Sequence, residues 1–302
     1  MDSTGFFVQF PHPRGEHVPA SDQMPWNVGA HGRKFLVAPG AYLDDNGDSV
    51  AEAELVFWGE WEPPSRVVTR WPPSGYLPRV LHRPFWIRPT TDGYRQNTDP
   101  WVWGDQMLYS NCKQTTGRPH HRPNSMQRLD HGSVICFGST LGGEFCMDTV
   151  FVVASAEPWD PSETATLDAD DAFKVCTGQS LLTGEDEDDA ATCAARASLT
   201  LYRGATVDDP VEGMFSLVPA RRADGDDCRF ARPPVRLPGF VNPASTQSTW
   251  GSKRPLAIGT LHSLWEQVCH QVHAEDLLLA VRLQIPEREH DGPVPESNRR
   301  RC

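Results

Sequence analysis

The chain has 302 residues, 38% of them hydrophobic, and carries 28 Lys and Arg against 40 Asp and Glu, for a formal net charge of -12 at pH 7. This length is enough to bury a substantial core, in one elaborated domain or two ordinary ones. Because no run of roughly 18 apolar residues occurs and the first residues lack a signal-peptide pattern, we expect a soluble cytoplasmic protein that neither spans a membrane nor is exported.

The eight cysteines are scattered along the chain, with no C-x-x-C pair and no short-loop framework. This spacing favours reduced thiols over disulfides and argues against a structural zinc site. Cys136 and Cys146 lie inside apolar runs, where a buried thiol acts as a small hydrophobe. We therefore expect neither a metal nor a cofactor.

The charge is distributed unevenly along the chain. Between Arg66 and Arg128 there are ten basic residues and three acidic ones, whereas Glu157 to Asp189 contains eleven acidic residues and a single base, Lys174. Such asymmetry predicts a basic working face beside an acidic appendage, and the alternative is two solvated surfaces. A basic face keeps nucleic acid among the candidate partners despite the negative total.

Short aromatic and β-branched runs predict strands in the first part of the chain, at residues 6–10, 34–40 and 54–62. Pro11 ends the first strand and the Pro63-Pro64 pair ends the third, because proline lacks a backbone donor. The following residues, up to about Gly104, are rich in Arg, Pro and Trp. This composition excludes long helices and predicts an extended, pocket-forming connection.

Two β-branched, aromatic runs predict a hairpin in the middle of the chain. They are His131–Ser139 and Glu144–Ser155, joined by Thr-Leu-Gly-Gly. The acidic stretch that follows predicts a short helix around Ala169–Cys176. It then predicts a flexible tip at Gly184–Ala190, where charge is clustered and hydrophobicity is low.

The last third of the chain predicts two short strands, one long helix and a final strand. The two strands cover residues 198–205 and 213–222, and the final strand covers 277–285. The helix begins at Thr260, which can cap it. Its apolar face is formed by residues at helical spacing, namely Leu261, Leu264, Trp265, Val268 and Val272.

Several enzyme classes lack their sequence signatures here. The chain contains no Walker loop, dinucleotide fingerprint, G-x-S-x-G elbow, H-E-x-x-H motif or deaminase motif. The corresponding nucleotide, serine-hydrolase, zinc-protease and deaminase activities are therefore not expected.

One stretch resembles a known superfamily. From Tyr109 to Ser155 the chain reads YSNCKQ, then QRLDHGSVICFGS, then FCMDTVFVV. This pattern resembles the PUA-like superfamily, particularly its EVE-type and ASCH-type domains, although Gly132-Ser133 and Gly138-Ser139 differ from the residues typical of the family. The resemblance implies a small β-barrel that holds a flipped nucleobase in an aromatic-walled cleft. Relatives of this kind are often found with DNA modification and anti-phage systems.

With this resemblance we predict an α+β, β-rich fold: a PUA-like small barrel with long aromatic and Pro-rich loops and a C-terminal helix packed on the sheet. Residues 1–156 would form the barrel core with its basic aromatic loop, and residues 157–195 an acidic helical and flexible insert. Residues 196–286 would add strands and the C-terminal helix to the same domain. The charged, Pro-rich residues 287–302 are expected to form a disordered tail.

Aromatic rings and hydrogen-bonding side chains are concentrated in RQNTDPWVWGDQMLYSNCKQ. Rings can stack on a base for roughly 1–3 kcal/mol each, and amides and carboxylates can match its edge. The predicted base-binding residues are Asn97, Trp101, Trp103, Asp105, Tyr109 and Asn111. The predicted phosphate-binding residues are Arg14, Arg88, Arg95 and Lys113. The alternative is that the tryptophans belong to the core and the amides form turns.

Hydrolysis of an N-glycosidic bond suits such a pocket because a carboxylate can orient water while an amide or histidine stabilises the leaving base. Asp148 is one candidate catalytic residue, since it lies inside an apolar strand where burial would raise its pKa, unless it faces solvent on an alternating strand. Asp99 is the other candidate.

The loop His12-Pro-Arg-Gly-Glu-His directly follows the first predicted strand, a position where a rigid scaffold often aims functional residues. Glu16 and His17 are therefore also predicted to be catalytic, as a general acid or base. The alternatives are phosphate contact, metal ligation by two histidines and a glutamate, or a purely structural loop.

These observations predict a base-flipping, DNA glycosylase-like hydrolase that acts on a modified base in anti-phage defence. Its expected partner is modified DNA, with no membrane and no inferable protein partner. One alternative is a non-catalytic reader, which binds without leaving abasic sites. The other is a small-molecule enzyme or binding protein that uses the HPRGEH loop, for which DNA interaction would be weak and insensitive to salt.

Overall fold

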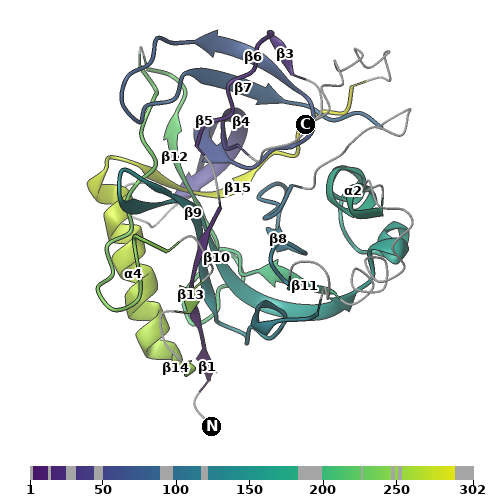
Figure 1. Ribbon diagram of the computed structural model, residues 1–302, viewed down its shortest axis with the longest axis vertical. Coiled ribbons are helices and arrows are strands. Elements are labelled where there is room, and N and C mark those ends of the chain that lie inside the picture. The colour runs from purple at the N-terminus through teal and green to yellow at the C-terminus, as the bar shows by residue number, and fades with distance from the viewer. Residues whose placement is uncertain are drawn as a thin grey trace.

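The computed structural model describes residues 3–12, 15–24, 32–43, 50–88, 98–116, 122–182, 199–225, 227–245, 249–250 and 254–289. Two large sheets hold most of the strands, with a few helices at their margins (Figure 1). The β-rich, α+β prediction is therefore confirmed.

The first sheet has six strands in the order β13-β2-β9-β10-β11-β8. The strands are β2 (Phe7–Pro11), β8 (Leu108–Tyr109), β9 (Val134–Leu141), β10 (Glu144–Trp159), β11 (Leu199–Gly204) and β13 (Thr249–Trp250). The predicted hairpin is confirmed as β9 and β10, which pair up to Leu141 and Glu144. Gly142 and Gly143 alone form its turn, at φ of 58° and 85°, a backbone region that glycine enters without strain.

The second sheet has seven strands in the order β15-β12-β5-β4-β7-β6-β3. The strands are β3 (Gln23–Met24), β4 (Lys34–Leu43), β5 (Val50–Gly59), β6 (Ser65–Arg70), β7 (Val80–Pro84), β12 (Val218–Arg222) and β15 (Leu278–Leu283). β15 also pairs with β4, so that β4, β5, β12 and β15 close into a ring of hydrogen-bonded strands. A separate two-stranded pair joins β1 (Thr4–Gly5) and β14 (Leu256–Ala257).

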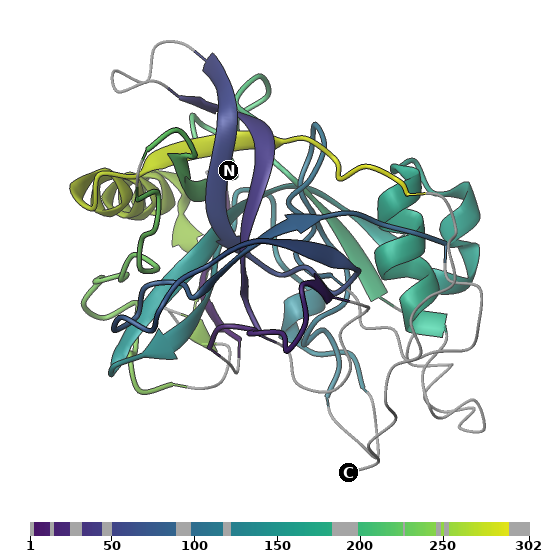
Figure 2. The same cartoon turned by 90° about the horizontal axis from the view of Figure 1, so that it is seen from above.

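Helical segments lie on opposite sides of the strands (Figure 2). On one side is α4 (Ile258–Ala274), whose predicted apolar residues are all buried. The helix begins two residues before Thr260 and has no side-chain cap, so the predicted capping role of Thr260 is wrong. On the other side are α1 (Asp171–Phe173), a π-helical turn at Lys174–Gly178 and α2 (Gln179–Leu182), where a short helix was predicted.

Three predictions about irregular segments have different outcomes. The Arg/Pro/Trp-rich region contains two strands, β6 and β7, because its prolines lie at strand ends and leave the β-branched run at residues 67–69 uninterrupted. The predicted disordered tail is wrong for residues 287–289, whose backbone bonds to Trp86 at 3.0 and 2.9 Å. The flexible tip at 184–190 and residues 290–302 lie outside the described residues.

The core divides into two clusters on opposite faces of β4. Leu36 and Ala38 face the tryptophan-rich cluster, whereas Phe35 and Val37 face the cluster that α4 covers. Among the described residues, no helix is long and apolar enough to cross a membrane. The six cysteines in the described ranges are free thiols.

Candidate functional site

Buried charges are concentrated where the start of β4 meets the end of β5. Six charged residues are each at most 4% exposed: Arg33, Lys34, Glu60, Glu62, Asp148 and Arg232. Charged side chains are rarely this buried unless they are paired, and such clusters occur often at functional sites. The candidate site is therefore built around these residues.

Arg33 holds two carboxylates together on one face of β4. Its Nε–H donates to Asp148 Oδ2 at 2.5 Å, and its Nη1–H donates to Glu60 Oε2. His12 Nε2 lies 3.2 Å from the same Glu60 oxygen. Burial opposes the charge of Arg33, but the two carboxylates outweigh it and raise the pKa of Arg33 above its usual value. We call His12, Arg33, Glu60, Asp148 and Arg232 the Arg33 cluster.

Arg232 completes this cluster from a loop of the second half of the chain. It donates to Ser139 Oγ at 2.8 Å, stacks over Trp58 at 4.9 Å, and lies 4.0 Å from Asp148. Burial lowers the pKa of Arg232 to about 10, although Asp148 counteracts this effect. Arg232 therefore remains a cation at neutral pH.

Strand pairing explains why these residues meet. Lys34 is paired with Gly59, which brings the preceding Arg33 beside the following Glu60. The pairing of β9 with β10 shifts between Met147 and Thr149, so Asp148 is the extra residue of a β-bulge, a feature that redirects a side chain. Gly138 lies opposite, and a Cβ there would be 2.1 Å from the carbonyl oxygen of Cys146.

A second set of buried polar side chains lies on the other face of β4. Lys34 donates to the Pro63 carbonyl at 3.2 Å, and burial lowers its pKa to about 7 despite the charge of Glu62. Ser65 Oγ lies 3.2 Å from His82 Nδ1, and both side chains are fully buried. Burial, with Lys34 nearby, lowers the pKa of His82 to about 3.

Two of the predicted catalytic residues are carboxylates buried in or near the Arg33 cluster. Asp148 belongs to it, so the alternative that it faces solvent is wrong because the bulge turns it inward. Asp99 accepts backbone N–H bonds from Ser110, Asn111 and Cys112 at 2.6–3.0 Å. Burial raises the pKa of Asp99 to about 6, with these bonds opposing and Glu60 adding to the shift. Asp99 therefore stabilises the 110–112 loop.

The backbone of Glu16 and His17 adjoins Arg33, and Glu16 forms an isolated β-bridge with it. Glu16 accepts the backbone N–H groups of Arg79 and Val80 at 2.6 and 2.9 Å and pairs with the Arg79 side chain, which is a structural role. The backbone of His17 donates to the Arg33 carbonyl at 2.8 Å. Burial, with Lys34 nearby, lowers the pKa of the half-buried His17 to about 4.

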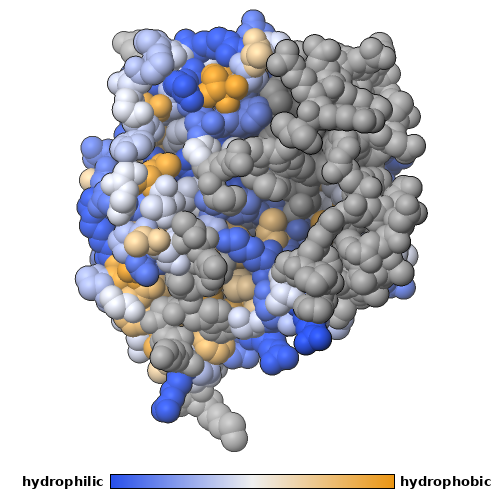
Figure 3. Space-filling model, viewed as in Figure 1, coloured by the Kyte–Doolittle hydropathy of each residue, from blue (hydrophilic) through white to orange (hydrophobic). Residues whose placement is uncertain are grey.

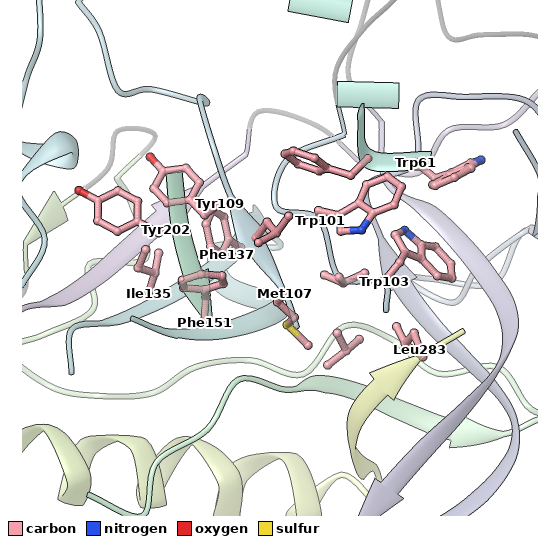
Figure 4. Packing of buried hydrophobic residues seen from close by; sticks show 14 of the residues in the cluster. Trp61, Trp101, Trp103, Met107, Tyr109, Ile135, Phe137, Phe151, Tyr202 and Leu283 are labelled. Atoms are coloured by element: carbon pink, nitrogen blue, oxygen red, sulfur yellow. The ribbon is translucent and has the colours of Figure 1, made fainter. Parts of the chain in front are cut away.

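The predicted stacking rings belong to the core (Figure 4). Trp101, Trp103 and Tyr109 are each 0% exposed. Trp103 packs edge-on against Trp61, and Tyr109 stacks on Tyr202 at 5.5 Å. Because protein covers these rings, they form no open stacking surface, and the alternative that the tryptophans are core residues is correct.

The other predicted base-binding residues are dispersed. Asn111 donates to Ser110 Oγ at 2.9 Å within its own loop. Asp105 is 96% exposed and lies beside Arg282 in a groove that is remote in the fold from the start of β4. Asn97 lies outside the described residues.

The predicted phosphate-binding residues also have different positions. Lys113 points inward, donating to the Pro11 carbonyl and lying 4.8 Å from the centre of the Phe10 ring, so a phosphate role is not supported there. Arg88 is exposed. Arg14 and Arg95 lie outside the described residues.

Much of the basic segment is neutralised by ion pairs. Four of its arginines each pair with an acidic residue: Arg66 with Glu289, Arg70 with Asp22, Arg79 with Glu16 and Arg83 with Glu54. Arg88, Arg122 and Arg128 are exposed and make no ion pair with another described residue. On the face seen in Figure 3, the coloured surface is mainly hydrophilic, with apolar residues in separate spots.

Sequence reasoning did not identify Arg33, Glu60 and Arg232. A signal existed for the first two, because Arg33-Lys34 and Glu60-Trp-Glu62 place charges directly against apolar strand runs. No comparable signal marks Arg232, which reaches the cluster through a long irregular loop. Among the described residues, no group of three His, Cys, Asp or Glu is arranged to hold a metal ion.

Comparison of the chain with protein-family models, with curated proteins and with solved structures finds no match. The PUA-like resemblance therefore stays a prediction.

Proposed function

We propose that this protein recognises a nucleobase, a modified one in DNA, and hydrolyses its N-glycosidic bond at the Arg33 cluster. The observation that carries the proposal is the arrangement of Arg33 between the carboxylates of Glu60 and Asp148, with His12 3.2 Å from Glu60. It supplies buried hydrogen-bonding groups and an adjacent acid–base pair in one place.

The charge of the cluster favours a neutral ligand. Two guanidinium groups face two carboxylates, so these four side chains carry no net charge, and His12 adds one positive charge only while it is protonated. Arg33 Nη2 and Arg232 Nε are buried donors that have no hydrogen-bond partner among the described residues. A nucleobase is neutral and offers carbonyl acceptors beside N–H donors, which matches guanidinium and carboxylate groups. A phosphate would add unbalanced negative charge.

The proposed reaction needs only water and the acid–base pair. Protonated His12 donates its proton to the leaving base nitrogen as the bond to C1′ breaks, and Glu60 stabilises the cationic sugar. Water then adds its oxygen to C1′ and gives a proton to Glu60. The contact between Glu60 and His12 returns that proton to the histidine, and the products are the free base and an abasic sugar.

Support for DNA as the substrate comes from Arg88, Arg122 and Arg128, which are exposed cations able to contact phosphates. A second candidate substrate is a free nucleoside, without nucleic acid. The ion pairs that neutralise Arg66, Arg70, Arg79 and Arg83 favour this alternative, because paired arginines are less available to a phosphate backbone.

The proposal includes a relationship to the PUA-like barrels that hold flipped bases. Its support is that the resembling segment forms the β9–β10 hairpin, and that this hairpin supplies Ser139 and Asp148 to the cluster. A solved structure of the protein with a bound base would test this relationship directly.

The test is incubation of the purified protein with unmodified DNA and with phage DNA carrying hypermodified cytosines, followed by mild alkali and strand-length analysis. We expect cleavage of the modified DNA alone, lost in Glu60→Gln and in His12→Gln. Glu54→Gln is the matched control, since Glu54 lies on β5, the strand that ends just before Glu60, but is exposed. Circular dichroism checks that each variant is folded.

The other outcomes separate the alternatives. Intact DNA that binds in a salt-sensitive manner would indicate a reader without hydrolytic activity. Release of free base from nucleosides, with DNA left intact and unbound, would support the second candidate. Full activity in both Glu60→Gln and His12→Gln would refute the assignment of the site.

A further inference from the structure

The Arg33 cluster is nearly closed to solvent. Its five side chains are each at most 7% exposed. Any ligand can therefore reach these groups only when part of the surrounding chain moves. A segment suited to such a movement is formed by residues 15–22, which we call the strap.

The strap lies directly beside Arg33. The N–H of Arg33 donates to the Gly15 carbonyl at 2.9 Å, and the N–H of His17 donates to the Arg33 carbonyl at 2.8 Å. These bonds form a parallel β-bridge between Glu16 and Arg33, and residues paired in this way point their side chains to the same face of a sheet. Glu16, with a side chain only 9% exposed, therefore borders the Arg33 cluster.

The contacts that hold the strap in place are polar and lie mostly at the surface. The Arg70 side chain donates to the carbonyls of Pro19 and Ser21 at 3.1 and 2.9 Å, and to Asp22 Oδ1 at 3.0 Å. Of residues 15–22, Pro19 alone is buried, and none belongs to either hydrophobic cluster of the core. A segment with few buried apolar contacts and exposed hydrogen bonds opens at a low free energy.

Gly32 allows the strap to lie close to the strand that it borders. An added Cβ at Gly32 would be 2.8 Å from the Cβ of His17 and 3.0 Å from its Cα. The backbone of Gly32 is not in the left-handed region, so alanine would strain only this contact. Gly32 and Arg70 thus act on the strap from two separate places, and neither belongs to the Arg33 cluster.

We infer that the strap opens as a unit and gives ligands access to the Arg33 cluster, with Arg70 as the latch that holds it closed. Opening breaks the bridge between Glu16 and Arg33 and moves Glu16 away from the cluster. The inference concerns access to the cluster whatever its ligand is, so it goes beyond the proposed function and does not rest on it.

The first test is amide hydrogen exchange of the full chain, measured by NMR. The amides of His17, Arg33 and Val67 report opening, because each is hydrogen-bonded to or from the strap. They should have similar protection factors, at least about 100-fold lower than that of Val150 in the buried part of β10. Protection as high as that of Val150, or widely different protection among the three amides, would overturn the inference.

Two variants should open the strap from different sides. Arg70→Ala removes three exposed hydrogen bonds and should lower the protection of the three reporting amides about tenfold. Gly32→Ala should lower it as well, by the contact with His17. Arg83→Ala is the matched control, since it removes an exposed ion pair with Glu54 in the same sheet and should leave these amides unchanged. Unchanged protection of Val150 shows that each variant is folded.

The second test measures access to the cluster by thiol labelling. Ser139→Cys places a thiol where the wild-type side chain is 1% exposed and contacts Arg232. Its reaction with iodoacetamide, located by peptide mass mapping, should become about tenfold faster when Arg70→Ala is added and should not change when Arg83→Ala is added. If the strap amides exchange faster in Arg70→Ala but the labelling rate stays the same, the strap does not control access and the inference is overturned.

Discussion

The guanidinium of Arg33 donates to the carboxylate of Asp148 at a position where each side chain is only 2% exposed. Asp148 occupies a β-bulge and Arg33 precedes β4, so the ion pair joins the two large sheets. Removing one partner of a buried pair leaves an uncompensated charge, which costs more than the pair itself contributes.

Asp148→Asn is therefore expected to lower the free energy of unfolding by about 3–5 kcal/mol. Urea unfolding at pH 7 measures this change. The control is Asp209→Asn on an exposed loop, which should change the free energy by less than about 0.5 kcal/mol. An Asp148→Asn variant as stable as the wild type would mean that this ion pair is not formed in solution.

Lys34 makes the free energy of unfolding depend on pH in the neutral to alkaline range. Because burial lowers its folded pKa from 10.5 to about 7, the unfolded chain binds more protons between these values, and stability from this residue rises with pH across that window. From pH 7 to 8.5 the unfolding free energy of the wild type should rise relative to that of the neutral double variant Lys34→Met, Glu62→Gln. The limiting slope is about 1.4 kcal/mol per pH unit. If the difference between the two proteins does not change with pH, the pKa of Lys34 is not lowered in the folded protein.

His82 makes the free energy of unfolding depend on pH in the acidic range. Its folded pKa of about 3 lies below the usual 6.5, so the stability that it contributes is present above pH 6.5 and is lost as pH falls towards 3. When the pH is lowered from 7 to 5, the unfolding free energy of the wild type should fall by about 1–2 kcal/mol more than that of His82→Gln. His270→Gln, on the exposed side of α4, should behave as the wild type does.

Gly138 is required by the close approach of β10. An added Cβ would meet the Cys146 carbonyl oxygen at 2.1 Å, and a backbone atom cannot move aside easily. Gly138→Ala should therefore reduce the unfolding free energy by about 1–3 kcal/mol, and should shift the bulge that holds Asp148. Urea unfolding measures this change, and Gly259→Ala, where nothing lies within 4 Å, should be neutral or stabilising in the same assay.

Local sequence signals predicted the elements that depend on local physics. The Gly142-Gly143 pair marked the hairpin because it supplies positive φ, and the helical spacing of Leu261 to Val272 marked α4 because its apolar face is continuous. β6 and β7 were not predicted, because the high proline content of the region indicated an irregular connection. The prolines lie at the ends of these strands and therefore do not interrupt them.

The site was less predictable because it is made by contacts between distant segments. Arg33 meets Glu60 only through the register of β4 with β5, and Asp148 turns inward only through a bulge. Trp101 and Trp103 have the residue types of a stacking surface, but whether a ring is covered depends on how Trp61 and Phe173 pack against it. Residue type thus indicated the chemistry available, and tertiary pairing decided which residues are brought together.

The ring of β4, β5, β12 and β15 has a consequence for biosynthesis. Its closing strand, Leu278–Leu283, is translated after its other three members, so a nascent chain leaves the free edge of β12 and the later half of β4 unpaired until residue 283 has been added. Unpaired edges can join strands of other chains. The pairing of β15 with β12 and β4 therefore both completes the ring and protects these edges from aggregation.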